Sequence, residues 1–168
     1  MPKTIKIIGI NPGTRYIGFA IFHGSELRDW GIKNIGGKSK EKMWKAMAII
    51  SGLLGQHEPD VLALKELHPS RSSSNLNRMV ARTKELAKRK GVRICQYPIK
   101  ELESGFHSEK INRRELAEIV ASSYPVLSHD LNKEKTIRNP YYIRMFEAVA
   151  LGSLCFHRLD RRRWARAI

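Results

Sequence analysis

The chain has 168 residues, of which 42% are hydrophobic, so it is long enough for one domain with a buried core and is not a disordered polymer. Its 31 lysine and arginine residues against 16 acidic residues give a formal net charge of +15. A balance this basic favours a polyphosphate partner such as nucleic acid over a membrane surface, because no basic segment also carries a wide apolar face.

The sequence contains no apolar run of transmembrane length, and its start predicts a strand rather than a signal peptide. Two cysteines in apolar stretches, Cys95 and Cys155, indicate buried thiols in a reducing compartment, so we expect a cytoplasmic protein.

The first 35 residues predict an antiparallel meander of three strands, over residues 6–10, 16–22 and 27–35. The first strand stops at Asn11-Pro12-Gly13, because proline ends a ladder and glycine permits the turn.

Helices and strands alternate over the rest of the chain. Apolar residues at helical spacing predict a helix over residues 39–56, and the run "DVLALKEL" predicts a buried strand over residues 60–67. A helix over residues 76–90 closes at Gly91, and a strand follows over residues 92–98. Asn112 with Glu115 is typical of a capping box that begins a helix ending at Ser122, and a last helix is expected over residues 141–159. We therefore predict an α/β fold with a mixed five-stranded sheet flanked by helices, in one domain over residues 1–160 with a basic tail over residues 161–168.

Three stretches carry a resemblance to a known family: "GINPGTRYIGFAIF" at the first turn, "PDVLALKEL" on the fourth strand and "FEAVALGSL" on the last helix. With this order of elements, most of the chain resembles the RNase H-like superfamily, and within it the RuvC family of Holliday junction resolvases. The resemblance implies phosphodiester hydrolysis by two Mg²⁺ (or Mn²⁺) ions held by four carboxylates. One acid ends the first strand, one lies on the fourth strand, and two lie one turn apart on the last helix.

This chain departs from that pattern at several positions. Asn11 stands at the first acid and offers an oxygen without a charge, so it is a weaker metal ligand. Lys65 stands at the second, and its neighbour Glu66 reaches the same side only through a bulge or a one-residue slip. On the last helix Glu147 matches one acid, whereas Arg144 stands where the other is expected. The resemblance thus assigns catalytic and metal-binding roles to Asn11, Glu66 and Glu147, while the two cations can neutralise a phosphate directly.

Basic and hydroxyl residues outside this centre are candidates for nucleic-acid contact. The loop "HPSRSSSNLNR" follows the fourth strand, the next helix carries an arginine face, and "EKINRRE" lies near a helix start, where free amides favour phosphate. A solvated loop and a solvated helix face are the alternatives. The candidates, with the two cations of the centre, are Lys65, Arg71, Ser72, Ser73, Arg78, Arg82, Lys110, Arg113, Arg114 and Arg144.

The residues leave the function open between several readings. The first is a RuvC-like protein selective for branched DNA such as a Holliday junction, with metal-dependent endonuclease activity weakened by the loss of acids. The second is an inactive protein that binds a junction or an RNA on the same fold, and needs no cofactor. A single-domain relative of the actin-like phosphotransferases is the third. Glu147 is accordingly either a metal ligand or the partner of Arg144 or Lys65. The resemblance also implies a homodimer, because RuvC-like proteins are two-fold dimers, which matches a two-fold junction.

Overall fold

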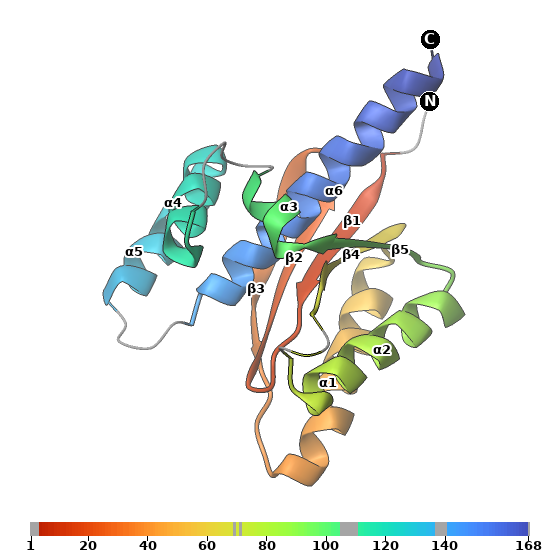
Figure 1. Ribbon diagram of the computed structural model, residues 1–168, viewed down its shortest axis with the longest axis vertical. Helices are drawn as coiled ribbons and strands as arrows, with labels where there is room; N and C mark the ends of the chain where they lie inside the picture. Colours follow the sequence, from red (N-terminus) through yellow and green to blue (C-terminus); the bar gives the residue numbers. More distant parts are fainter. Residues whose placement is uncertain (1–3, 69, 71, 105–110, 137–140, 168) are drawn as a thin grey trace.

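The computed structural model describes residues 4–68, 70, 72–104, 111–136 and 141–167 (Figure 1). At its centre is a five-stranded sheet in the order β3-β2-β1-β4-β5. The first three strands pair antiparallel, whereas β4 runs parallel to both β1 and β5, so the predicted mixed sheet is confirmed. The strands are β1 (Lys6–Asn11), β2 (Tyr16–His23), β3 (Glu26–Asn34), β4 (Val61–Glu66) and β5 (Arg93–Pro98).

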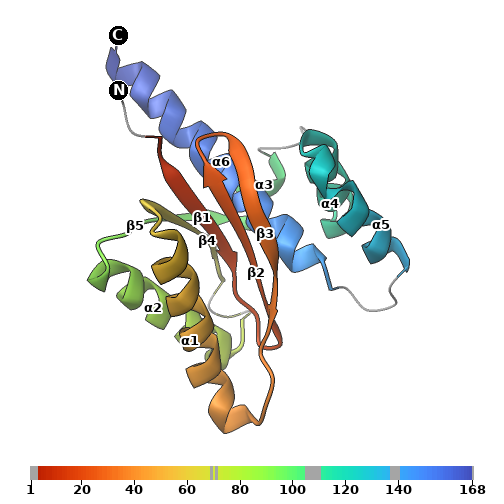
Figure 2. The ribbon, with the colours of Figure 1, turned by 180° about the vertical axis from the view of Figure 1, so that it is seen from behind.

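Helices cover both faces of the sheet and give three layers (Figures 1 and 2). Two helices pack on one face, and α6 crosses the other face, with α4 and α5 packed outside it. The last helix continues well beyond its expected end at residue 159. The helices are α1 (Ser39–His57), α2 (Ser74–Arg89), α3 (Ile99–Ser104), α4 (Arg113–Ser123), the 3₁₀ helix η1 (Pro125–Leu127), α5 (Ser128–Thr136) and α6 (Ile143–Ala167).

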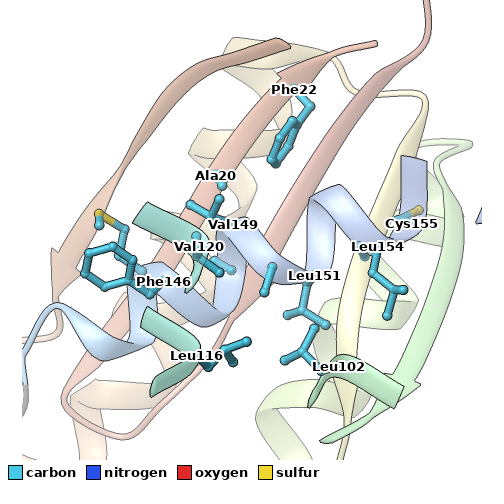
Figure 3. Packing of buried hydrophobic residues seen from close by; sticks show 14 of the residues in the cluster. Ala20, Phe22, Leu102, Leu116, Val120, Phe146, Val149, Leu151, Leu154 and Cys155 are labelled. Carbon is cyan, nitrogen blue, oxygen red and sulfur yellow. The ribbon is translucent and has the colours of Figure 1, made fainter. Parts of the chain in front are cut away.

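Each face of the sheet has its own hydrophobic core, because successive strand residues point to opposite sides. Ile7 and Ala63 face α6, whereas Ile8 and Leu64 face α1 and α2. Figure 3 shows the α6 side, where the helix packs against β2 and α4, with Ala20, Phe22, Leu116, Val120, Phe146 and Val149 among the residues of this core.

Two strand glycines let the backbone of α6 lie directly on the sheet. A Cβ at Gly9 would overlap the carbonyl of Ala148, and a Cβ at Gly18 would overlap the carbonyl of Arg144. The contact therefore brings the turn of α6 that contains Arg144, Glu147 and Ala148 against the carboxyl end of β1.

In the part of the chain that the structure describes, we find no helix that is both long enough and apolar enough to span a membrane.

Candidate functional site

Glu147 is a buried carboxylate at the carboxyl end of β1, with 1% of its surface exposed. Asn11 Nδ2 donates to its Oε2 at 2.7 Å, and Arg113 Nε donates to its Oε1 at 2.6 Å. Lys65 Nζ lies 3.4 Å from Oε2. A buried carboxylate is stable only when such partners replace its hydration. Three segments far apart in the sequence therefore converge on one acid.

Asn11 ends β1 and is itself only 3% exposed. A carboxylate can only accept hydrogen bonds, so the amide must turn its nitrogen, not its oxygen, toward Glu147. The same nitrogen lies 3.4 Å from the carbonyl oxygen of Arg144, which is also an acceptor. The position thus requires a donor, and an aspartate in the same place would put two carboxylates in contact.

Lys65 reaches the site from β4, beside Asn11. Ile10 pairs with Leu64 in the parallel register, so the next residue of each strand lies at the same edge of the sheet. The pairing of β4 with β5 continues to Glu66 opposite Pro98 without a bulge. Glu66 therefore shares the face of Leu64, toward α1 and α2, and is exposed. The structure brings Asn11 and Glu147 together but leaves Glu66 apart from them. Glu66 would reach their face of the sheet only through a bulge or a one-residue slip of β4, and the observed strand register has neither.

Arg144 lies one turn before Glu147 on α6 and turns its guanidinium to the β1–β2 loop. Its terminal nitrogen lies 3.4 Å from the carbonyl oxygen of Pro12. Gly13 leaves the room that this group fills, because a side chain there would meet the guanidinium. Burial lowers the pKa of Arg144, and the charge of Arg113 lowers it further, whereas Glu147 raises it. An arginine nonetheless stays charged in proteins, so this is a partly desolvated cation.

Arg113 is the first residue of α4, and Asn112 caps that helix by accepting from the backbone N–H of Glu115 at 2.8 Å. The predicted helix start at Asn112 is therefore confirmed. The side chain of Arg113 is 50% exposed although its Nε contacts the buried Glu147. Among the contacts of the described residues only Nε is engaged, so the terminal N–H groups of this half-exposed side chain can donate to a further anion.

Comparison with solved structures places this geometry in a known architecture. RuvC of Thermus thermophilus in complex with a Holliday junction substrate superposes with a TM-score of 0.69 over 93% of this chain and 96% of that one, at 16% identity. The yeast mitochondrial Holliday junction resolvase Ydc2 gives 0.65 over 96% and 82%, at 13% identity. The chain has the fold of the RuvC-type Holliday junction resolvases. The fowlpox virus resolvase, solved with substrate Holliday junction DNA, also shares it, with a TM-score of 0.61 over 90% and 99% at 11% identity.

These likenesses are in the fold alone, because every one lies far below the identity at which function follows. No model of a protein family matches the sequence, and no curated protein sequence matches it.

Among the residues that the structure describes, the RuvC-type fold does not bring together side chains that fit a two-metal centre. No group of three or more His, Cys, Asp or Glu residues lies together in the described ranges. Both oxygens of Glu147 already accept from cations or an amide. Three cations, Lys65, Arg113 and Arg144, surround this one carboxylate, so the cluster has a formal charge of +2 where a metal pair needs several negative charges. The charge favours binding of an anion rather than of Mg²⁺ or Mn²⁺.

The other candidate contact residues that the structure describes lie outside this cluster. Ser73 caps α2 by accepting from the backbone N–H of Leu76 at 3.2 Å, and the carbonyl oxygen of Ser72 lies 3.5 Å from an amide nitrogen of Asn77. Arg78 and Arg82 line a pocket between α1 and α2. Arg114 is exposed in the first turn of α4, and Arg71 and Lys110 lie outside the described residues.

Proposed function

We propose that this protein binds branched DNA on a RuvC-type fold and holds the phosphate backbone in its cationic cluster, without metal-dependent cleavage. The observation that carries the proposal is the set of donors around Glu147, namely Asn11, Lys65 and Arg113. Asn11 and Lys65 stand at positions where the resemblance to the RuvC family implies metal-binding acids.

Exposure of the two outer cations supports a phosphate-binding role. The side chain of Lys65 is 23% exposed and that of Arg113 is 50% exposed, whereas Glu147 is covered by them. Each cation therefore keeps donors on the outer side while its inner side is fixed by the carboxylate. Glu147 then acts as an anchor that orients the cations, and their remaining N–H groups can donate charge-assisted hydrogen bonds to a phosphate oxygen.

The overall charge and the fold agree with this partner. A formal net charge of +15 supplies the long-range attraction, which acts on any nucleic acid and is strongly screened by salt. Selection for a branched structure is the part of the proposal that the fold supports, since two of the similar structures were solved with Holliday junction DNA. We further propose a homodimer, because two equivalent copies match the two-fold symmetry of a four-way junction.

The test is the salt dependence of binding to a labelled four-way DNA junction, measured by fluorescence anisotropy with a linear duplex as competitor. We expect wild type to prefer the junction. Lys65→Gln and Arg113→Gln should each weaken binding and lower the slope of log affinity against log salt by about one, the loss of one phosphate contact.

Arg28→Gln is the matched control. Arg28 pairs with Glu26 at 3.2 Å on β3 near the β2–β3 turn, at the end of the sheet away from Asn11. The substitution Arg28→Gln removes one positive charge without touching the cluster, so the slope of log affinity against log salt should stay that of wild type. If Lys65→Gln and Arg113→Gln bind the junction with wild-type affinity and slope, the cluster is not the phosphate site.

A further inference from the structure

The α1–α2 side of the molecule has a pocket of about 430 Å³ next to the β1–β2 loop. Thr14 lines it from that loop, whose Pro12 accepts from Arg144 of the cluster. The pocket and the cluster thus flank the same loop at the carboxyl end of β1, although they lie on opposite layers of the sheet. The volume of the pocket is within the range of sites that bind small ligands.

Trp44 is the unusual member of this pocket. It lies on α1 and is 73% exposed, and it is one of two large hydrophobic side chains that the described residues leave in water. Its neighbour Met43 and the next-turn residue Met47 pack toward the core beneath α1, and Trp44 does not join them. A tryptophan in solvent lacks the free energy that burial of its large apolar surface would provide, so stacking of a ligand on its exposed ring is favourable.

Four cations line the same pocket as Trp44. Lys40 and Lys42 come from the first turns of α1, and Arg78 and Arg82 come from the facing side of α2. The described residues that line the pocket include no aspartate or glutamate. A flat aromatic face among four cations matches a nucleotide, in which a planar base is joined to anionic phosphates.

We propose that this pocket holds an unpaired nucleotide, with its base stacked on Trp44 and its phosphates on Arg78 and Arg82. A base within a duplex has both faces covered by its neighbours, so only an unpaired base offers a face to the indole. The pocket would then take a single-stranded or flipped nucleotide of the same DNA that reaches the cluster. As a subsite of a larger DNA it rests on the proposed function, but its chemistry can be measured alone.

The probe is a single-stranded oligothymidylate of about ten nucleotides, within the usual range of site sizes. Binding is followed by quenching of tryptophan fluorescence and, independently, by anisotropy of a labelled oligonucleotide. Trp44→Phe keeps an aromatic face, and Trp44→Leu keeps apolar bulk without one. Since Trp44 is exposed, both variants are expected to fold, which circular dichroism checks.

Wild-type fluorescence should be quenched by the oligonucleotide. Trp44→Leu should bind it about fivefold or more weakly, whereas Trp44→Phe should keep most of the affinity by anisotropy and lose the quenching. A fully paired duplex of the same length should bind all three proteins alike. The inference is overturned if Trp44→Leu binds the oligonucleotide as wild type does, or if its duplex binding falls as much. It is also overturned if either variant changes the oligomeric state in sedimentation, since the pocket would then hold a second copy of the chain.

The same experiment separates this inference from the proposed function. Lys65→Gln and Arg113→Gln should weaken junction binding and leave the quenching by oligothymidylate intact. Junction binding without quenching would remove only the pocket proposal. Quenching without preference for a junction would remove only the branched-DNA proposal.

Discussion

Asn11 shows how one amide changes the chemistry of a site. It differs from aspartate by an NH₂ group in place of an oxygen, yet that group is what faces the buried Glu147 at 2.7 Å. A hydrogen bond to a charged group inside a protein is stronger than a neutral one, and the loss of its donor leaves an acceptor unsatisfied. The amide of Asn11 therefore stabilises the fold by donating to the buried Glu147, and is not merely a weakened metal ligand.

The substitution Asn11→Asp tests this at the residue itself. It keeps the shape of the side chain but replaces a donor with a second carboxylate, so we expect the free energy of unfolding at neutral pH to fall by about 1–3 kcal/mol. Urea denaturation measures the change. Asn132→Asp on the exposed side of α5 is the matched control and should stay within about 0.5 kcal/mol of wild type. Recovery of the lost stability on addition of Mg²⁺ would show instead that the cluster accepts a metal once position 11 is acidic.

Cys155 gives a second prediction, on alkaline stability. A hydrogen bond with Cys95 and then burial raise the pKa of the Cys155 thiol, and burial raises the pKa of the Tyr97 phenol. Both groups keep their protons in the folded chain, whereas in the unfolded chain a thiol ionises near pH 8.5 and a phenol near about pH 10. The unfolded state then binds fewer protons, so the free energy of unfolding falls as the pH rises above about 8.5.

Each such group contributes a slope of up to about 1.4 kcal/mol per pH unit once its unfolded form has ionised. We therefore expect Cys155→Ala, measured by urea denaturation in reductant, to lose stability less steeply than wild type between about pH 8.5 and 10. Parallel curves for the two proteins would mean that the thiol does not titrate differently in the folded and unfolded states.

At the scale of elements, the contact of α6 with β1 and β2 positions the whole site. Gly9 and Gly18 permit this contact, and the turn of α6 that it holds bears Arg144 and Glu147. Figures 1 and 2 show α6 crossing the sheet, with its N-terminal end at the side of α4 and α5. Glu134 of α5 accepts from the backbone N–H of Tyr142 at 2.8 Å, just before α6 begins. Both contacts determine where Glu147 meets Asn11.

Gly18→Ala should therefore lower the stability of the fold, although it adds only one methyl group. The added Cβ would overlap the backbone of Arg144, and because a helix backbone cannot turn aside as a side chain can, we expect a loss of about 1–3 kcal/mol in the free energy of unfolding. Gly52→Ala is the matched control. Gly52 lies in α1 with open space around it, so alanine there should raise stability by about 0.5–1 kcal/mol. Equal effects of the two substitutions would indicate that α6 does not press on β2.

Most elements of the sheet and its main helices were predictable because each has its own local pattern. Asn11-Pro12-Gly13 ends a strand, Gly91 ends a helix with a positive φ of 73°, and Asn112 with Glu115 starts another. The short α3 and the polar α5 were not predicted, because α5 buries Glu134 rather than a series of apolar residues. The extension of α6 to Ala167 was missed because the sequence of its last turns is rich in arginine and has few apolar residues at helical spacing.

At the scale of the whole molecule, the site was only partly predictable. Alignment with a resembling family indicated Asn11, Lys65, Arg144 and Glu147, and the possible pair of Lys65 with Glu147 followed from their expected places. The contact of Arg113 with Glu147 spans 34 residues and depends on how α4 packs against α6, which no local pattern records. Trp44 lies one position off the series of core methionines on α1, and that offset was the signal for its exposure.

The net charge acts at this scale too. Any nucleic acid is drawn to a chain with a formal charge of +15, so affinity alone says little about the site. The informative quantities are the preference for one structure over another, the salt slope of variants, and the requirement for metal.

The requirement for metal tests the central claim most directly. Wild-type protein is incubated with a labelled four-way DNA junction in EDTA, in Mg²⁺ and in Mn²⁺, and each mixture is run on native and denaturing gels. The charge cluster predicts the same junction shift in EDTA as in Mg²⁺, with all strands intact on the denaturing gel. Strand cleavage that needs the metal and disappears in Glu147→Gln would contradict it, because Glu147 would then be a metal ligand rather than the anchor of three donors.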